Sequence, residues 1–344
     1  MLNKLIGNNR IKETLRRLIE AKRVPNALLF AGEEGIGKRL FALELAKVFV
    51  CQNSKTIEAC DSCNACRRAE VFNLPKTGDK DENEKIFFSE LSDIGLVRPA
   101  GKFITVKQIR DVETEANFRP FEASARFFLI DDADKMNDAA ANALLKTLEE
   151  PPAASHIFLI TSRPMSLLPT IRSRCQMLRF APVDAKEIES YLLKTKKFAP
   201  DDAELIARLS RGSLGYALEI DLEKFRVQRE AMQKVLESLL MKKDRAALLR
   251  TAEEMNDAKN KDVYENYLEI LETLIHDVWA LHLGAGEEAI VNVDLKTGLQ
   301  RLAEKADSRK LAAWLSEIEN MRESFAVNIN RKIATDALFM QMAN

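Results

Sequence analysis

The hydrophobic positions in the first part of the chain alternate between short continuous runs and helically spaced sets. Residues 24–30, 126–131 and 157–161 form short apolar runs that are typical of buried strands. Residues 38–50 and 139–150 carry apolar side chains at helical spacing, and the second set stops before a pair of prolines. Strands that alternate with helices along the chain predict a parallel sheet covered by helices, which is the α/β class.

After residue 180 the pattern becomes helical. Residues 184–219 are typical of short helices, and from residue 222 onward apolar side chains recur at helical spacing with charged residues on the other faces. The last segment, of ~120 residues, has the size of a separate helical domain. We expect an α/β domain over 1–181, a small helical domain over 182–221 and a larger all-α domain over 222–344. Residues 77–86 are polar and charged and predict an exposed loop.

Composition and charge narrow the classes of protein that fit. The chain has 344 residues, with 52 Lys and Arg against 53 Asp and Glu, so its net charge is −1. This balance excludes a globally basic protein that coats DNA, although it leaves a local basic patch open. No apolar run approaches the ~20 residues that span a bilayer, and the first residues lack the apolar core of a signal peptide. We therefore expect a cytoplasmic protein with no membrane contact.

A glycine-rich segment lies between the first predicted strand and the following helix. Gly32, Gly37 and Lys38 match the G-x-x-x-x-G-K pattern of a phosphate-binding loop, and Gly35 lies inside it. Glycines let backbone N–H groups turn toward phosphate oxygens, while the helix N-terminus and the lysine add positive charge. The segment predicts a nucleotide-binding P-loop.

The next position departs from that pattern. A P-loop that holds Mg²⁺ has Ser or Thr there, because the hydroxyl is a metal ligand. This chain has Arg39, which has no oxygen to donate and competes with the metal. We expect weak or metal-independent binding of ATP or ADP, and impaired hydrolysis. Arg39 alone does not decide whether the chain is an ATPase.

Two acids follow the second predicted strand. Asp131 stands where a P-loop protein carries its Mg²⁺-linked carboxylate, and Asp132 stands where hydrolytic members carry Glu to polarise water. Aspartate is one methylene shorter than glutamate, so its reach differs. The alternative interpretation is a solvated acidic end of a strand.

Four of the five cysteines are grouped within 16 residues. In the cytosol they stay reduced, so their spacing is interpreted first as a metal site. The spacing C-x8-C-x2-C-x2-C suits a tetrahedral structural Zn²⁺ with no open position for catalysis. A cluster of another metal and unconnected thiols are the alternatives. The ligands would be Cys51, Cys60, Cys63 and Cys66.

The motifs together resemble the bacterial AAA+ clamp-loader subunits of DNA polymerase III. The P-loop, the cysteine group, Asp-Asp-Ala-Asp at 131–134, the segment 140–152 and Ser173-Arg174-Cys175 occur in the order of that family. The match is dense over residues 5–180, weaker over 181–220 and mostly architectural beyond. The resemblance implies an AAA+ P-loop domain with a zinc module at 51–66, a helical lid at 182–221 and a helical collar at 222–344.

Within that family the delta prime type is favoured over its gamma/tau paralogue. Arg39 replaces the metal-binding hydroxyl residue, and Gly215 stands where the paralogue carries a nucleotide-sensing arginine. The chain also lacks the long tail of tau forms. One alternative is a hydrolytically active gamma/tau-like ATPase, for which Lys38, Asp131 and Asp132 would suffice. Another is a nucleic-acid-binding zinc module on an inactive nucleotide fold, which the near-neutral charge disfavours.

The resemblance also implies partners and residue roles. Arg174 would be an arginine finger that acts in trans on the ATP site of an adjacent gamma/tau subunit, and Thr161 and Ser162 fall at the end of the sensor strand. The partners would be gamma/tau and delta subunits in a hetero-pentamer, the sliding clamp and primer–template DNA. Lys107 and Arg110 are candidate DNA contacts, although a solvated helix face explains them equally well.

Overall fold

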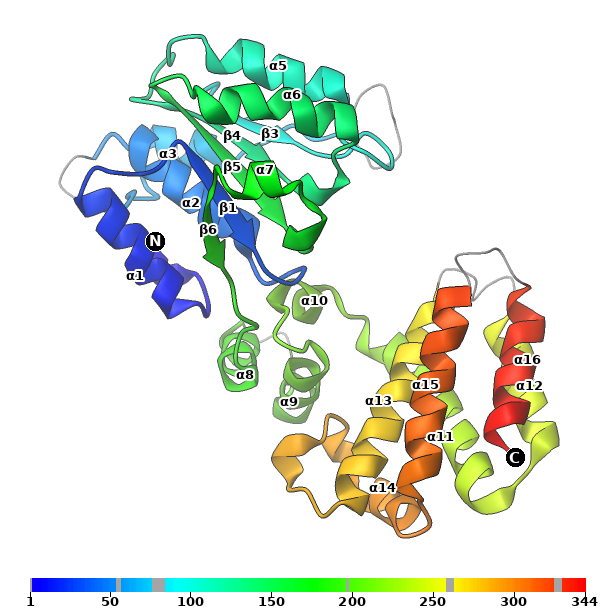
Figure 1. Ribbon diagram of the computed structural model, residues 1–344. Helices are drawn as coiled ribbons and strands as arrows, with labels where there is room; N and C mark the ends of the chain where they lie inside the picture. Colours follow the sequence, from blue (N-terminus) through cyan, green and yellow to red (C-terminus); the bar gives the residue numbers. More distant parts are fainter. Residues whose placement is uncertain (1, 54–56, 76–83, 196–197, 258–262, 325–329) are drawn as a thin grey trace. The chain divides into compact units, whose positions relative to one another are not determined.

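The computed structural model describes residues 2–53, 57–75, 84–195, 198–257, 263–324 and 330–344. The chain divides into two compact units, Met1–Tyr191 with Ser210–Leu218 and Leu192–Leu209 with Glu219–Asn344 (Figure 1). The segment 182–221, expected as a separate small domain, is shared between these units, and its limits remain a prediction. Of the loop expected at 77–86, residues 77–83 lie outside the described part of the chain.

The first unit contains a six-stranded sheet in the order β2-β3-β4-β5-β1-β6. Strands β3, β4, β5, β1 and β6 pair in parallel, whereas β2 at the edge is antiparallel to β3, so the sheet is mixed rather than purely parallel as predicted. The α/β class and the three predicted strands are confirmed. The strands are β1 Ala27–Ala31, β2 Phe87–Phe88, β3 Ile94–Val97, β4 Arg126–Ile130, β5 Ser155–Thr161 and β6 Gln176–Arg179.

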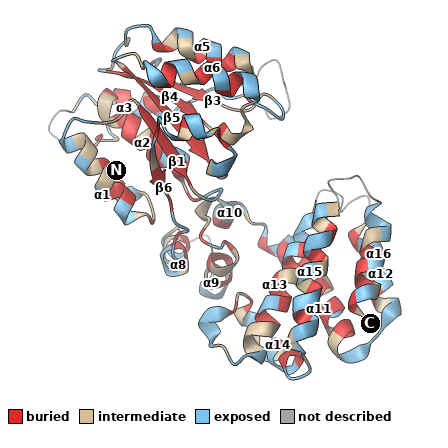
Figure 2. Ribbon diagram, viewed as in Figure 1, coloured by how far each residue is buried: buried red, intermediate tan, exposed pale blue. Residues whose placement is uncertain are grey.

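Helices cover both faces of this sheet. Alternate residues of a strand point to opposite faces, so Leu28 and Phe30 pack against α1 and α2, whereas Leu29 faces the core under α5 and α6. Figure 2 shows the central strands buried throughout. The helices of the first unit are α1 Asn9–Glu20, α2 Lys38–Val50, α3 Asn64–Ala69, α5 Val106–Ala116, α6 Asp138–Glu149, α7 Pro169–Arg172 and α10 Leu214–Glu219, with short 3-10 turns at Leu2–Lys4, Ala133–Lys135 and Pro164–Ser166. Helix α8 Ala185–Lys194 begins in the first unit and ends in the second.

The regular elements in the described part of the second unit are all helices, as the spacing after residue 222 predicts. Helix α13 supplies buried Leu268, Leu271 and Leu274, and it packs against α11, α14 and α15. The helices are α9 Pro200–Leu209, α11 Leu222–Glu237, α12 Arg245–Met255, α13 Tyr264–His282, α14 Lys296–Ala303, α15 Ser308–Ser324 and α16 Arg331–Met342, with a π-helical turn at Ser238–Lys242 and 3-10 turns at Glu287–Ala289 and Val293–Leu295. None of the helices in the described ranges is long and apolar enough to cross a membrane.

Candidate functional site

The order of the strands brings the predicted nucleotide-binding residues together at the carboxyl ends of the central strands. Strands β1 and β5 are neighbours, with Ala31 opposite Thr161, and the Gly32 N–H donates to the Thr161 carbonyl at 3.2 Å. Strand β4 lies on the other side of β5, so Asp131 follows it at the same edge. The carboxyl ends of parallel strands are where α/β proteins place ligands.

The P-loop forms between β1 and α2 with the expected backbone geometry. Gly35 and Gly37 have φ of 73° and 95°, a left-handed conformation that favours glycine, and α2 begins at Lys38. The Lys38 ammonium donates to the carbonyl oxygens of Gly32 and Glu33 at 2.7 and 2.5 Å. Burial lowers the pKa of Lys38. Its charge is therefore held by carbonyl groups of the loop itself.

The segment that includes Gly215 packs directly on this loop. The Gly215 N–H donates to the Gly35 carbonyl at 2.8 Å. A Cβ on Gly215 would lie 3.0 Å from the Gly35 Cα, and a Cβ on Gly35 would lie 2.1 Å from the Ser213 Oγ. A side chain at position 215 would need the P-loop backbone to shift by a few tenths of an ångström, and one at position 35 would need the Ser213 hydroxyl to turn away. The role of Ser213 was not predicted, because its partner is far away in the sequence.

The two acids at the end of β4 are each paired with a cation of the chain. Arg39 Nη1 donates to Asp131 Oδ2 at 3.0 Å, and Lys135 Nζ donates to Asp132 Oδ2 at 2.8 Å. Burial raises the pKa of Asp131, and the Arg39 charge opposes that shift. Asp132 itself lies in a left-handed turn, with φ of 52°. The acids are present as predicted, but each carboxylate already has a cationic partner.

The donor set at this edge does not fit the Mg²⁺ of a P-loop. Such a metal needs a hydroxyl oxygen at the position of Arg39 and a carboxylate available from Asp131. The structure instead places a guanidinium at 3.0 Å from that carboxylate. A cation of the protein thus stands next to the group that would otherwise hold the metal.

Thr161 is engaged by an acid that the sequence reasoning did not single out as a site residue. Its Oγ1 donates to Asp134 Oδ1 at 2.6 Å and accepts the Arg163 N–H at 2.9 Å. The Arg163 Nε donates to Asp134 Oδ2 at 3.0 Å. Asp134 belongs to the same Asp-Asp-Ala-Asp motif, which was the signal that could have found it. Ser162 follows Thr161 directly after β5.

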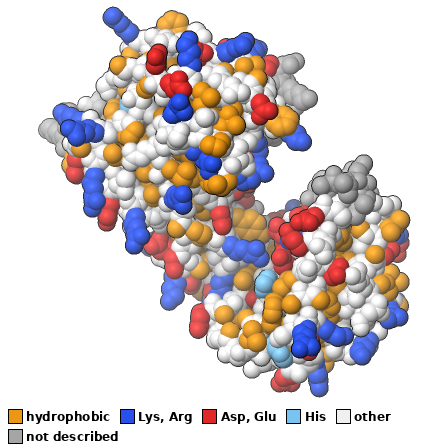
Figure 3. Space-filling model, in the orientation of Figure 1, with side chains coloured by type: hydrophobic (Ala, Val, Ile, Leu, Met, Phe, Trp, Pro, Cys, Tyr) orange, Lys and Arg blue, Asp and Glu red, His pale blue; other side chains and the backbone are white. Residues whose placement is uncertain are grey.

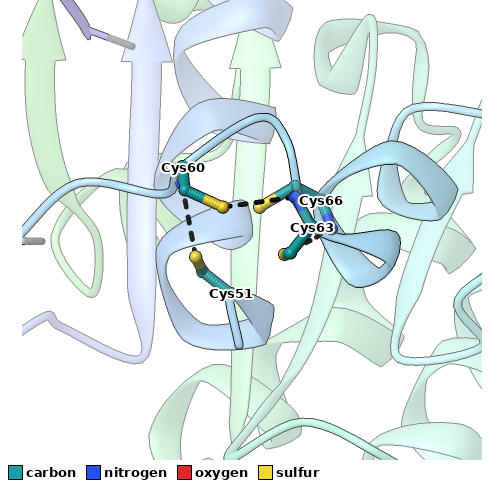
Figure 4. A group of neighbouring side chains, drawn as sticks. All are labelled: Cys51, Cys60, Cys63 and Cys66. Atoms are coloured by element: carbon teal, nitrogen blue, oxygen red, sulfur yellow. Dashed lines mark hydrogen bonds between the residues drawn. The ribbon is translucent and has the colours of Figure 1, made fainter. Parts of the chain in front are cut away.

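The four predicted zinc ligands converge. The Sγ atoms of Cys51, Cys60, Cys63 and Cys66 all lie within 4.8 Å of one another (Figure 4). In a regular tetrahedral Zn²⁺ site the sulfurs are about 3.8 Å apart, given Zn–S bonds of about 2.3 Å. A small contraction of the group would therefore satisfy the metal, and the residues fit a structural zinc.

Backbone N–H groups point at these sulfurs. The N–H groups of Cys60, Cys63 and Cys66 lie 3.3, 3.3 and 3.4 Å from the Sγ atoms of Cys51, Cys60 and Cys63, respectively. Such donors favour the thiolate, which is the form that binds metal. Bonds from the Ser62 side chain and from the N–H groups of Cys63 and Ser62 lower the pKa of Cys60 to about 6. Burial raises the pKa of Cys66.

A buried lysine ties the cysteine segment to α2 and α3. Lys47 is fully buried, and its Nζ bonds to Glu44 at 2.8 Å, to Asp61 at 2.5 Å and to Glu70. Lys4 Nζ reaches the other oxygen of Asp61 at 2.8 Å. The pKa of Asp61 is lowered, because the bonds from the two lysines outweigh the opposing effect of burial. The network holds the loop that carries Cys60 and Cys63 against the sheet domain.

Replacing Lys47 with methionine is expected to lower the free energy of unfolding by about 3 kcal/mol, because removing the buried cation leaves three clustered carboxylates that repel one another. Urea unfolding at neutral pH measures this loss. Lys4→Met is the matched control, since it removes a mostly exposed lysine from the same Asp61 and should cost much less than the loss of Lys47. Equal losses for the two variants would contradict the assigned role of Lys47.

Arg174 lies in the turn that follows the short helix α7. The backbone N–H of Arg174 donates to the Ile171 carbonyl at 3.1 Å, and Ile171 and Cys175 are both buried. Arg174 Nη2 donates to Glu149 Oε1 at 2.5 Å. Like the contact of Ser213, the pairing of Arg174 with Glu149 was not predicted from the sequence, because Arg174 and Glu149 belong to different elements.

Lys107 and Arg110 are both exposed on α5, as the helix prediction implies. The start of this helix is fixed by a capping box between Thr105 and Gln108. Lys107 Nζ lies 3.5 Å from Glu84. Basic and acidic side chains both occur on the visible face of each unit (Figure 3). A role of these two residues in DNA binding stays a prediction.

Comparison with known proteins agrees with this geometry. A family model described as "DNA polymerase III, delta subunit" matches residues 7–184, more than half of the chain. A second model, "DNA polymerase III, delta subunit, C terminal", matches residues 228–342. The two matches together span both structural units. They define the class of protein as a DNA polymerase III subunit of the AAA+ clamp-loader type.

Individual relatives narrow the class further. DNA polymerase III subunit delta' of Bacillus subtilis is 31% identical to this chain, over 93% of this chain and 92% of its own length. The delta' subunit of Escherichia coli is 28% identical, over 96% of this chain and 92% of its own length. The chain belongs to the delta' family. The Escherichia coli tau subunit is 30% identical, but over only 63% of this chain and 32% of its own length. A solved gamma subunit-related protein from Thermotoga maritima matches 96% of this chain and 98% of its own, with 19% identity and a TM-score of 0.38.

Proposed function

We propose that this chain is a stator of the DNA polymerase III clamp loader: it does not hydrolyse ATP itself and contributes Arg174 to the ATP site of an adjacent gamma/tau subunit. The complex would load the sliding clamp onto primed DNA. The Arg39–Asp131 ion pair at 3.0 Å carries the first part of this proposal. It puts a protein cation where hydrolysis needs a metal ion.

Three further features support a degenerate ATP site. The Lys38 ammonium bonds to carbonyl groups of its own loop, and Asp132 pairs with Lys135. The Gly215 backbone lies against Gly35, so the position of the paralogue's sensing arginine carries no side chain. In this proposal Lys38 and Asp132 are paired within the chain and are not available to bind phosphate or to polarise water. The arginine that would sense the nucleotide is absent, because position 215 is glycine.

The proposed arginine finger is supported by its position in the Ser173-Arg174-Cys175 motif and by its partial exposure. A guanidinium offers several N–H donors in a plane, which suits the oxygens of a transferring phosphoryl group. Arg174 follows α7 in a backbone that buried residues on both sides hold in place. In this proposal the finger acts on a neighbour's nucleotide.

The remaining parts take structural and binding roles in the proposal. The cysteine group binds a structural Zn²⁺ that braces residues 51–66, the segment 182–221 is the lid, and the helices of 222–344 form the collar that joins the subunits. Partners are gamma/tau and delta subunits in a hetero-pentamer, the sliding clamp and primer–template DNA. Lys107 and Arg110 are the proposed DNA contacts on this chain.

Steady-state hydrolysis of ATP by the purified chain tests the degenerate site. With Mg²⁺ and primed DNA present, the wild-type chain and Lys38→Ala are expected to show the same background rate, because Arg39 blocks the metal. A phosphate-release assay over a range of enzyme concentrations measures both. Complete clamp loader assembled with an active gamma/tau subunit serves as the positive control for the assay.

The opposite outcome identifies the alternative function. Turnover by the wild-type chain that Lys38→Ala abolishes would mean that the P-loop works despite Arg39. The chain would then be a gamma/tau-like ATPase. Turnover that persists in Lys38→Ala would point to a contaminant, and the protein would be repurified before either conclusion is drawn.

A further inference from the structure

The guanidinium of Arg174 is clamped between two acceptors. Its Nη2 donates to Glu149 Oε1 at 2.5 Å, and its Nη1 donates to the Thr170 carbonyl at 3.0 Å. One acceptor is at the end of α6 and the other is in α7, and these two helices pack against each other. Because the two bonds use different nitrogens of a planar group, they fix its orientation as well as its position.

Both acceptors are anchored by buried neighbours. Glu149 is the last residue of α6 and follows Leu148, which is buried in the sheet domain. Pro151 prevents the helix from continuing, so the carboxylate is presented at a defined point. On the other side, buried Ile171 holds the turn that contains Thr170. The backbone that carries each acceptor is therefore held in place by the core of the fold.

The clamp leaves the guanidinium able to bind phosphate. A guanidinium has five N–H donors, and the two bonds described here occupy two of them. The side chains of Arg174 and Glu149 are 34% and 51% exposed, respectively. The attraction between the Arg174 and Glu149 charges is modest at such exposure. The main effect of Glu149 is therefore on the orientation of the Arg174 guanidinium, and its effect on the electrostatic potential of that group is small.

We propose that Glu149 is a positioning residue, which holds Arg174 in the orientation that meets the phosphate groups of a nucleotide bound to a neighbouring subunit. The inference rests on the role proposed for Arg174. Without the clamp, a long side chain with many rotamers has to be ordered when the subunits engage, and this ordering has a cost. The carboxylate itself stays outside the chemistry.

The test uses the assembled clamp loader and compares three variants of this chain. Glu149→Ala removes the acceptor, Glu149→Gln keeps an oxygen acceptor without the charge, and Glu150→Ala is the control. Glu150 is the adjacent exposed glutamate at the C-cap of α6, and the bond to Arg174 comes from Glu149. Arg174→Ala, measured in parallel, defines the phase of ATP hydrolysis that depends on the finger.

Glu149→Ala is expected to slow the Arg174-dependent phase by about threefold to tenfold, which corresponds to ~0.6–1.4 kcal/mol at about 1.36 kcal/mol per tenfold. The ATP concentration that gives half of the maximal rate should not change, because that nucleotide binds to the neighbour. Glu149→Gln should restore the rate to within twofold of the wild type, and Glu150→Ala should leave it unchanged. A merely structural role would instead lower complex formation or the melting temperature, which are measured on the same samples.

Two results would overturn the inference. A rate for Glu149→Ala equal to that of the wild type would mean that the clamp does nothing for the finger. A faster rate would mean that Glu149 restrains Arg174. If Arg174→Ala does not slow ATP hydrolysis, the proposed function fails. If Arg174→Ala slows hydrolysis and Glu149→Ala does not, only the positioning role of Glu149 is overturned.

Discussion

Replacing Arg174 with alanine is expected to slow ATP hydrolysis by about a thousandfold or more at the site that it serves, because an arginine finger stabilises charge that develops on the transferring phosphoryl group. In the proposed hetero-pentamer, ATP sites that Arg174 does not serve would also turn over, so total turnover is a poor measure of one site. Chemical-quench measurement of the first turnover resolves it. The amplitude of fast hydrolysis should fall by the equivalent of a single ATP per complex.

Two variants make this result specific. Arg174→Lys keeps the positive charge but loses the planar fork, and we expect it to be nearly as slow as Arg174→Ala. Arg172→Ala removes a charge two residues earlier, at the end of α7, and should leave the fast amplitude intact. An undiminished amplitude for Arg174→Ala, with complex assembly verified by size-exclusion chromatography, would rule out the finger role.

The second large effect is expected for zinc. Purified protein should contain about one equivalent of zinc, and Cys63→Ser should lose the metal because three thiolates and a hydroxyl bind it far more weakly. Structural zinc contributes about 10–16 kcal/mol to the folding of isolated zinc-finger peptides, so its loss should lower the melting temperature clearly even though the sheet domain has its own core. Elemental analysis and thermal unfolding measure the two effects.

The fifth cysteine provides the control. Cys175 is buried in the core of the sheet domain, apart from the cysteine group, and burial raises its pKa to about 12. Cys175→Ala should therefore keep its zinc even if it loses some stability. Wild-type protein with far less than one equivalent of zinc and fully reduced thiols would contradict the zinc assignment.

Features formed by residues close together in the chain were predictable from the sequence. The P-loop, helix α2 and the cysteine group each follow from a local spacing and the chemistry that it permits. Strands β2, β3 and β6 were not predicted, and β2 has only two residues. Strand β3 is a four-residue run that contains Gly95, and β6 exposes Gln176 and Arg179, so neither has the pattern of a buried strand.

Contacts between distant residues needed the structure. The apolar positions of α2 are nearly continuous, so their spacing does not show that Leu40 is 51% exposed while Lys47 is fully buried. The partner of Arg174 lies 25 positions earlier and the partner of Thr161 lies 27 positions earlier. Local pattern predicts which residues carry charge, but the order of the strands decides which of them meet.

The contact between Gly35 and Gly215 bears on how this subunit would respond to engineering. A Cβ at 215 would lie 3.0 Å from the Gly35 Cα and 3.1 Å from its carbonyl oxygen, so any side chain there requires the P-loop backbone to shift by a few tenths of an ångström. An arginine introduced at position 215 would therefore change the loop as well as add a charge, and its effect on nucleotide binding could not be assigned to the guanidinium alone.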